Sequence, residues 1–198
     1  MQRRMSFAQY RAMDLFAFTS VLCACEAMIV LAATRWFPAE PYTLSLTGAV
    51  TAVVMVRWGA WAAVPAVLGA LTLGAVSGAG LLQMVIYCAG NLLALALLPA
   101  LGRKGWKRLG DHVLLALAYG AFVPLLMQLG RAAAALLLGS PIGICFGFLT
   151  TDVLSTLFSA LIVWICRRLD GMLENQAHYV LRIQKEQEDM KNLGGIDP

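Results

Sequence analysis

The feature that most constrains this chain is a run from Trp58 to Leu101 that holds no Asp, Glu, Lys, Arg or His. As a helix, this run is long enough to cross a bilayer core of about 30 Å twice. A second run, Val113 to Cys166, is interrupted only by Arg131 and Asp152. Lipid cannot satisfy stray backbone amides, so each crossing must be a helix or part of a closed barrel, and neither run shows the alternation of barrel strands. We therefore predict an all-α polytopic membrane protein.

Composition excludes a soluble domain. The chain has 198 residues, of which 60% are hydrophobic and 13% are charged, whereas ordinary soluble domains are about 25% charged. In water, so short a chain would expose a large apolar surface. We interpret the net charge of +4 as a determinant of topology and of attraction to membrane lipid, not as a nucleic-acid-binding surface.

Short breaks rich in Gly, Pro and Ser divide the apolar sequence into six predicted spans, which implies a compact antiparallel bundle. The second span is the shortest and covers only about 22 Å as a helix, so it is the one most prone to stop short of a surface. The six predicted spans are Met13–Thr34, Tyr42–Val56, Gly59–Val76, Leu81–Leu101, Val113–Leu138 and Ile144–Cys166.

The basic residues predict the orientation, because cytoplasmic loops accumulate Lys and Arg. In the six-span arrangement nearly all of them fall on one side, and the opposite loops hold only Arg35. We therefore predict that both termini are cytoplasmic. The basic residues that flank the predicted spans on the cytoplasmic side are Arg3, Arg4, Arg11, Arg57, Arg103, Lys104, Lys107, Arg108, Arg167 and Arg168.

After residue 168 the chain changes character, so we divide it into a transmembrane domain, residues 1–168, and a cytoplasmic tail, residues 169–198. In the tail, apolar residues recur at helical spacing among charges, which predicts an amphipathic helix at the membrane surface with a disordered end at Gly194-Gly195. The five cysteines lie inside spans, with no His at metal-site spacing, so we expect neither a disulfide nor a metal site. The apolar residues of this helix are Leu169, Met172, Leu173, Val180 and Ile183.

Ionisable groups inside a bilayer are costly, so each is a candidate for function. Three qualify, Glu26, Arg131 and Asp152, and the predicted spans place all three in the outer half of the membrane. Polar and aromatic residues of the fourth and fifth spans and of the first outer loop lie at the same level. Together they predict a polar cavity that opens outward. The residues predicted to bind a solute are Glu26, Arg35, Trp36, Tyr42, Gln83, Tyr87, Asn91, Gln128, Arg131 and Asp152.

Each residue type suits a part of that task. Arg131 would fix an anionic or carbonyl group, while Asp152 and Glu26 would accept hydrogen bonds. Amides such as those of Asn91 and Gln128 read amide-like edges, and Trp36 or Tyr42 would cover an aromatic ring. The alternative is structural, because Arg131 would equally pair with Asp152 or Glu26 as a buried ion pair that only holds the bundle together.

The first span also has a ridge of small side chains on the face away from Glu26, with Ser20 and Ala24 in small-x-x-x-small spacing. Such spacing lets another helix approach closely, within the bundle or from a partner. The residues predicted to dock a partner are Ala17, Ser20, Ala24 and Ala27.

The motifs of ATP hydrolysis, serine hydrolysis and zinc proteolysis do not occur in this sequence: it has no G-x-x-x-x-G-K-[ST], no G-x-S-x-G and no H-E-x-x-H. Its two histidines, His112 and His178, lie at or beyond the predicted cytoplasmic boundary. We therefore do not expect an enzyme.

One passage is similar to the second and third spans of a known transporter family, in which a short Gly-containing cytoplasmic turn joins two helices rich in small residues. The passage runs from Tyr42-Thr43-Leu44-Ser45-Leu46 through Arg57-Trp58-Gly59-Ala60-Trp61 to Leu68-Gly69-Ala70. With its length, six spans and internal termini, the chain resembles, over roughly residues 10–168, the substrate-binding S component of energy-coupling factor (ECF) vitamin transporters.

The resemblance implies a subunit of a prokaryotic cell membrane that captures a vitamin or related micronutrient from outside. Such a subunit docks on a transmembrane coupling subunit through small residues of its first helix. Two cytoplasmic ATPases hydrolyse the ATP, so the subunit needs no cofactor of its own, and toppling within the membrane delivers the ligand.

Two other interpretations stay open. The chain would serve as a scaffold of envelope assembly if the polar residues only hold the bundle together. It would be a proton-coupled carrier or an intramembrane enzyme if Glu26 and Asp152 exchange protons. Capture requires a cavity lined by the ionisable residues, whereas a scaffold would pack them closely and without water.

Overall fold

The computed structural model describes residues 6–39, 44–99 and 108–183, and every regular element in these ranges is a helix. Five stretches are long and apolar enough to cross a membrane. The prediction of an all-α, multi-pass membrane protein is thus confirmed at this level. The five stretches are Phe7–Trp36, Thr47–Ser77, Leu81–Pro99, Val113–Leu137 and Ile142–Cys166.

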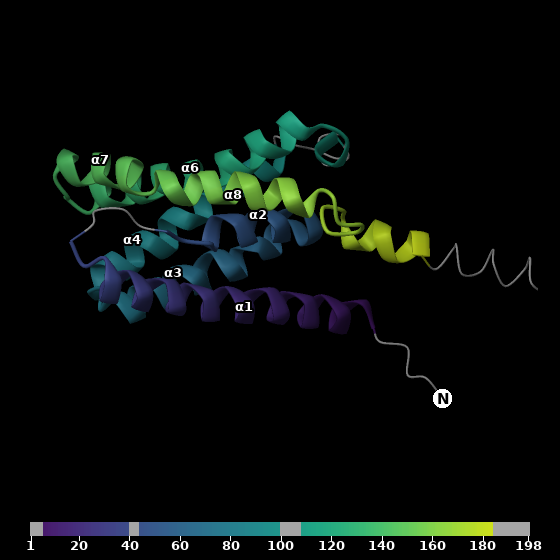
Figure 1. The fold of residues 1–198 in the computed structure, drawn as a ribbon, viewed down its shortest axis with the longest axis horizontal. Coiled ribbons are helices and arrows are strands. Elements are labelled where there is room, and N and C mark those ends of the chain that lie inside the picture. The colour runs from purple at the N-terminus through teal and green to yellow at the C-terminus, as the bar shows by residue number, and fades with distance from the viewer. Residues whose placement is uncertain (1–5, 40–43, 100–107, 184–198) are drawn as a thin grey trace, which may run out of the picture.

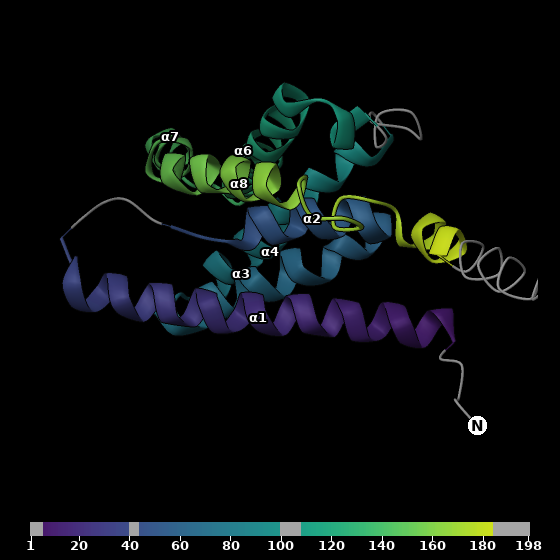
Figure 2. The ribbon, with the colours of Figure 1, turned by 45° about the vertical axis from the view of Figure 1, so that its right-hand side comes forward.

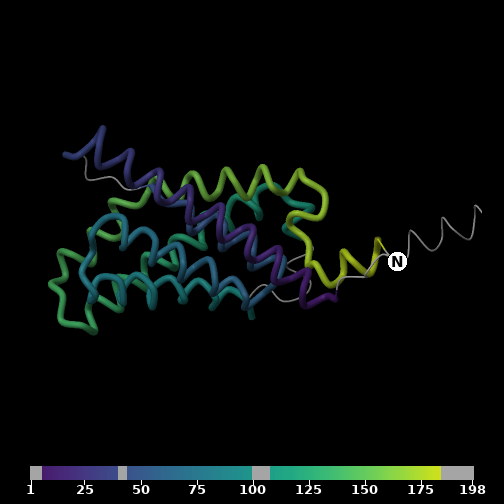
Figure 3. The backbone as a smooth tube through the Cα atoms, turned by 90° about the horizontal axis from the view of Figure 1, so that it is seen from below, coloured from purple at the N-terminus to yellow at the C-terminus, as the bar shows by residue number. Residues whose placement is uncertain are grey.

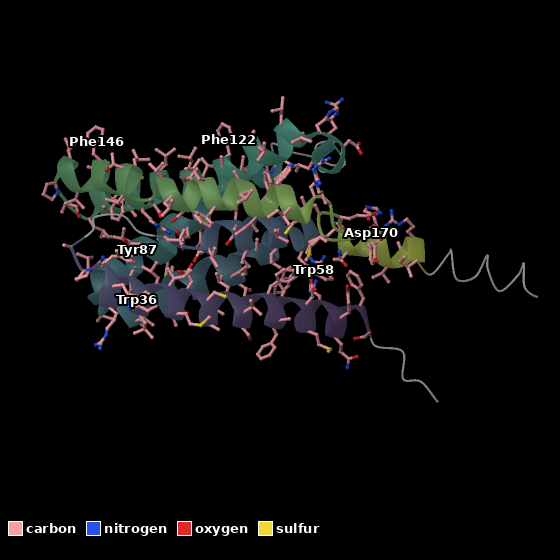
Figure 4. All side chains as sticks on the ribbon, viewed as in Figure 1. Trp36, Trp58, Tyr87, Phe122, Phe146 and Asp170 are labelled. Atoms are coloured by element: carbon pink, nitrogen blue, oxygen red, sulfur yellow. The ribbon has the colours of Figure 1, made fainter. Side chains whose placement is uncertain are left out.

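The helices lie roughly along the long axis of the molecule, and the chain reverses direction between successive long helices (Figures 1 and 2). Large apolar side chains cover the outside, as a lipid-facing surface requires. Phe122 and Phe146 point away from the bundle in Figure 4 and are 56% and 64% exposed. The start of α1 and residues 176–183 lie at the same end of the bundle (Figures 1 and 3).

Helix α1, Phe7–Trp36, begins earlier than the predicted Met13 because Ser6 and Gln9 form a capping box. Ser6 Oγ accepts from the Gln9 N–H at 3.2 Å, and Gln9 Oε1 accepts from the Ser6 N–H at 3.0 Å. Four residues at helical spacing face the bundle, and the opposite side of α1 is exposed. The buried residues of α1 are Leu15, Thr19, Leu22 and Glu26.

Helix α2, Thr47–Trp58, is the central helix, because every residue in it except Val50 is buried. It packs against α1 and against three later helices: α3, Ala63–Ser77; α6, Val113–Leu137; and α8, Val153–Cys166. The chain turns back through a short 3₁₀ helix, Gly59–Ala62, and Gly59 adopts a φ of +60° that favours glycine. The apolar stretch Thr47–Ser77 is therefore two short helices side by side (Figure 2).

The second span was predicted to run from Tyr42 to Val56, and of its two ends the structure describes only the C-terminal one, which was predicted two residues too early. The helix ends at Trp58 rather than Val56, and the predicted start at Tyr42 lies outside the described residues. At about 1.5 Å per residue, α2 is only about 18 Å long, well short of a bilayer core.

Helix α4, Leu81–Asn91, tightens into a 3₁₀ helix, Leu92–Ala96, directly after Asn91. It crosses α6, Val113–Leu137, backbone to backbone. A Cβ added at Gly90 would collide with the backbone of Arg131, and one added at Gly130 would collide with the Gly90 carbonyl. Two glycines therefore let α4 and α6 touch at the level of Asn91 and Arg131.

The predicted sixth span is two helices, not one. Helix α7, Ile142–Thr151, ends and α8, Val153–Cys166, begins at Asp152, whose φ of −106° and ψ of 17° are not helical. Both helices pack along α6.

The predicted tail helix begins later than residue 169. Residues 167–174 form turns, and the helix starts at Gln176. The helix cannot start earlier because Gly171 has a φ of +68° and because its carbonyl oxygen accepts a hydrogen bond from Arg57 Nη1 at 2.7 Å. The predicted disordered end lies outside the described residues.

Candidate functional site

A cavity of about 40 Å³ lies where α4, α6, α7 and the segment before α2 meet. It has room for a few water molecules, since each needs about 10–15 Å³ of such volume. Its walls combine one cation, one acid, two aromatic rings and two hydroxyls. The lining residues are Ser45, Leu73, Tyr87, Arg131, Phe148, Thr151 and Asp152.

Arg131 is the central group of this site. Its Nη1 donates to Asp152 Oδ2 at 3.1 Å, and each side chain of this ion pair is only 7% exposed. Its Nε donates to Asn91 Oδ1 at 2.9 Å. The guanidinium carbon lies 4.6 Å from the centroid of the Tyr87 ring, a cation–π contact. A buried charge needs such partners, because desolvation would otherwise make it costly.

Two amides hold the ion pair in place without lining the cavity. Asn91 is fully buried. Its Nδ2 donates to the Ala66 carbonyl of α3 at 2.9 Å, and its Oδ1 accepts from Arg131 Nε. Gln128 is also fully buried, and its Nε2 lies 3.2 Å from both the Asp152 carbonyl oxygen and Thr156 Oγ1. These amides thus orient Arg131 and Asp152 from behind.

Asp152 owes its position to the break between α7 and α8. Its Oδ1 accepts a hydrogen bond from Ser155 Oγ, and Ser155 Oγ in turn accepts from the Ser45 N–H at 2.9 Å. Helix interruptions at membrane depth are tolerated where the backbone is buried in protein or lines a cavity. Here the interruption turns a carboxylate toward Arg131.

Glu26 caps α2 rather than lining the cavity. Its Oε1 accepts from Ser45 Oγ at 2.6 Å, the Leu46 N–H at 2.8 Å, the Thr47 N–H at 2.9 Å and Thr47 Oγ1 at 2.8 Å. Helix α2 has no side-chain cap of its own, so a residue of α1 satisfies its first N–H groups. Glu26 Oε2 is buried and finds no partner among the described residues.

The contacts form one polar network through the interior of the bundle. It runs from Glu26 through Ser45 and Ser155 to Asp152, then through Arg131 to Asn91 and the backbone of α3. The three ionisable residues singled out by sequence are thus brought together, and the Arg131–Asp152 pairing foreseen as an alternative is present.

The structure places other predicted residues away from this network. Gln83 is exposed in the first turn of α4, and Arg35 and Trp36 are exposed at the end of α1. Trp36 is 72% exposed and lies at the same end of the bundle as Tyr87 (Figure 4). Tyr42 lies outside the described residues.

The ridge of small residues on α1 faces away from the bundle. Ala17, Ser20 and Ala24 are exposed and Ala27 is half-buried. The ridge is therefore open to lipid or to another helix.

Sequence reasoning missed several contributors. Leu73, Phe148 and Thr151 line the cavity, but apolar and hydroxyl residues are too common in membrane helices to stand out. Gly90 and Gly130 carried a signal that was not used, because each directly precedes a buried polar residue.

A second ion pair, in which Arg57 is buried and Asp14 is partly exposed, lies at the opposite end of the bundle. Arg57 donates to both oxygens of Asp14, at 3.0 and 2.9 Å, and Trp58 Nε1 donates to the same carboxylate. Arg57 also holds Gly171, and Tyr10 Oη donates to Gln176 Oε1 at 3.0 Å. Sequence reasoning treated Arg57 only as a topology signal, but here it fastens the tail to α1 and α2.

Within the described ranges, no group of three or more His, Cys, Asp or Glu side chains is placed to hold a metal ion. All five cysteines are free thiols. Comparison of the chain with protein-family models, with curated proteins and with solved structures found no match.

Proposed function

We propose that this chain is a membrane-embedded subunit that captures a small solute from outside the cell, as the S components of ECF transporters do. In this proposal the solute is a vitamin or related micronutrient, and a transmembrane coupling subunit with two ATPases provides the energy. The exposed ridge of Ala17, Ser20, Ala24 and Ala27 is the proposed docking face for the coupling subunit.

The observation that carries the proposal is that the Arg131–Asp152 pair lines a cavity. At the same level, α4 ends in a 3₁₀ helix and α7 is interrupted before α8, so both stretches depart from α-helical geometry there. A buried ion pair adds little net stability, because desolvation offsets most of its attraction. Ionisable groups inside a membrane protein usually belong to a ligand or ion pathway.

For topology, we propose six crossings, with both termini in the cytoplasm. Helix α3 is the third crossing, and the short α2 together with residues 44–46 that lead into it is the second. The support is the distribution of charge. Arg57 lies at the end of the bundle where α1 begins and the tail lies, and Arg167 and Arg168 follow α8 at that same end. Arg35 lies at the opposite end, in the last turn of α1. An excess of Arg and Lys on one side is typical of the cytoplasmic side.

The second candidate is a structural membrane protein, such as a scaffold of envelope assembly. The small cavity favours it, because ligand pockets usually measure about 300–1,000 Å³. Capture therefore requires the cavity to widen when the solute enters. The half-buried rings of Tyr87 and Phe148, which meet edge to face at 5.7 Å, are the side chains whose rotation would widen it.

The decisive experiment is purification in mild detergent, followed by native mass spectrometry for a retained small molecule and by thermal-shift measurements with a panel of vitamins. Capture predicts that a compound is retained or raises the Tm. It also predicts that the double variant Arg131→Met with Asp152→Leu, which removes both charges of the buried pair together, abolishes the effect. Arg182→Met is the matched control, because Arg182 is 44% exposed and lies in the tail. A protein that is repeatedly empty and indifferent to the panel would favour the scaffold.

A further inference from the structure

The charge balance of the cavity restricts what it can bind. Arg131 and Arg57 are the only buried Arg or Lys side chains in the described parts of the chain, and Arg57 lies at the other end, paired with Asp14. Arg131 is already matched by Asp152 at 3.1 Å. An anionic solute would thus bring a charge with no surplus cation to meet it, and an uncompensated buried charge is strongly disfavoured.

The hydrogen-bonding groups restrict the solute further. Arg131 uses Nε and Nη1 for Asn91 and Asp152, and its Nη2 has no hydrogen-bond partner in the described residues. Because Arg131 lines the cavity, its Nη2 is a donor available to an acceptor on a solute, such as a carbonyl oxygen. The Asp152 carboxylate lines the same cavity beside it and accepts hydrogen bonds, so a donor next to the carbonyl group would complement the pair.

The walls indicate the shape. The Tyr87 ring lies under the Arg131 guanidinium and meets the Phe148 ring edge to face. Aromatic side chains of this kind suit a flat partner, which they contact by stacking or by their edges. The cavity of about 40 Å³ must widen for any solute, and a single ring requires less widening than a bulky molecule.

Resting on the proposed capture function, we infer that the Arg131–Asp152 pair selects a neutral, planar heterocycle or aromatic amide that presents an N–H group next to a C=O group, and that it excludes the corresponding anions. The carbonyl oxygen would accept from Arg131 Nη2, and the N–H would donate to Asp152. Tyr87 and Phe148 would contact the ring. Asn91 acts as a positioning residue, because it reaches the solute only through Arg131.

The test compares matched compounds on the full-length protein in detergent, by thermal shift and by calorimetric titration up to millimolar concentration. Uracil and nicotinamide carry the required N–H and C=O groups and are neutral. Orotate and nicotinate add or substitute a carboxylate, and 1,3-dimethyluracil keeps the ring but lacks both N–H groups. We expect binding of at least one of the two neutral compounds and no binding of its matched anion or of the dimethyl derivative.

A charge change gives the second arm. Asp152→Asn leaves Arg131 unneutralised, so this variant should bind orotate or nicotinate within the millimolar range in which the unchanged protein binds neither. Asp170→Asn is the control, because Asp170 has a side chain that is 80% exposed. If Asp152→Asn does not fold, the comparison of matched compounds on the unchanged protein still decides.

The outcomes separate this inference from the capture function. Binding of an anion that equals or exceeds binding of its neutral partner would overturn the inference and leave capture standing, as would a retained ligand that is a cation. Binding of 1,3-dimethyluracil as tight as that of uracil would remove the role of the N–H group. If neither the matched compounds nor the vitamin panel binds and no molecule is retained, both proposals fail.

Discussion

Replacing Arg131 with Met should destabilise the bundle strongly, because the substitution strands two acceptors that are buried from solvent. Asp152 Oδ2 loses its cation at 3.1 Å, and Asn91 Oδ1 loses its donor at 2.9 Å. Asp152 is 5% exposed and Asn91 is fully buried, so bulk water does not reach either acceptor. Only the few waters that fit the cavity beside Asp152 can replace part of what is lost.

The magnitude follows from these two losses. Stranding a buried carboxylate by removing its partner costs about 3–5 kcal/mol. Leaving one neutral acceptor unsatisfied adds about 1–3 kcal/mol. The expected loss is therefore about 4–8 kcal/mol. The double variant Arg131→Met with Asp152→Leu has no buried charge, so it should regain most of the stability lost by stranding the carboxylate. The remaining loss should be about 1–3 kcal/mol.

The assay is reversible unfolding in mixed micelles, with the free energy of unfolding measured for both single variants and the double variant. The control cycle uses Arg182 and Asp170, an exposed pair at 3.4 Å whose removal should change stability by less than about 1 kcal/mol. If the costs of Arg131→Met and Asp152→Leu simply add, the two side chains do not act as a pair. The charge argument for this site would then be refuted.

Three further predictions concern the contacts around the site. Gly90→Ala should force α4 from α6 and lower stability by about 1–3 kcal/mol, while Gly143→Ala, which meets open space, should not; thermal unfolding compares the two. Glu26→Ala removes the cap of α2 and should cost about 2–4 kcal/mol, whereas Glu26→Gln keeps an acceptor oxygen and should cost less, and equal unfolding free energies would contradict the capping role. Arg57→Met removes one of the two donors to the Gly171 carbonyl oxygen, the other being Gln176 Nε2. It should make residues 169–175 faster to cleave in limited proteolysis, and an unchanged rate would show that the tail is held by other contacts.

Much of the fold could be predicted from hydropathy alone. The apolar runs predicted helices wherever the structure has long ones, because in lipid a segment must satisfy its own backbone hydrogen bonds. The ends of helices were less predictable. Ser6 extends α1 by capping it, and the short α2 depends on Glu26 of another helix, which no local pattern reveals.

The candidate site was predictable in its members but not in their roles. Arg131, Asp152 and Glu26 stood out because charge is rare in such sequence. That Arg131 pairs with Asp152, while Glu26 turns to α2, depends on distances between helices. The exposed positions of Gln83 and Trp36 likewise depend on how α4 and α1 are rotated in the bundle.

The sequence by itself determined that this protein lies in lipid, that it is helical, and which few charged side chains must be buried at a cost in free energy. Hydropathy and charge determine these points because they are properties of each segment alone. Only the tertiary structure decided which of these buried charged side chains contact one another. Gly90 and Gly130 bring α4 and α6 into contact, and the interruption at Asp152 turns a carboxylate to Arg131. Such pairing arises from close approach between helices far apart in the chain, and that is a property of the packed bundle.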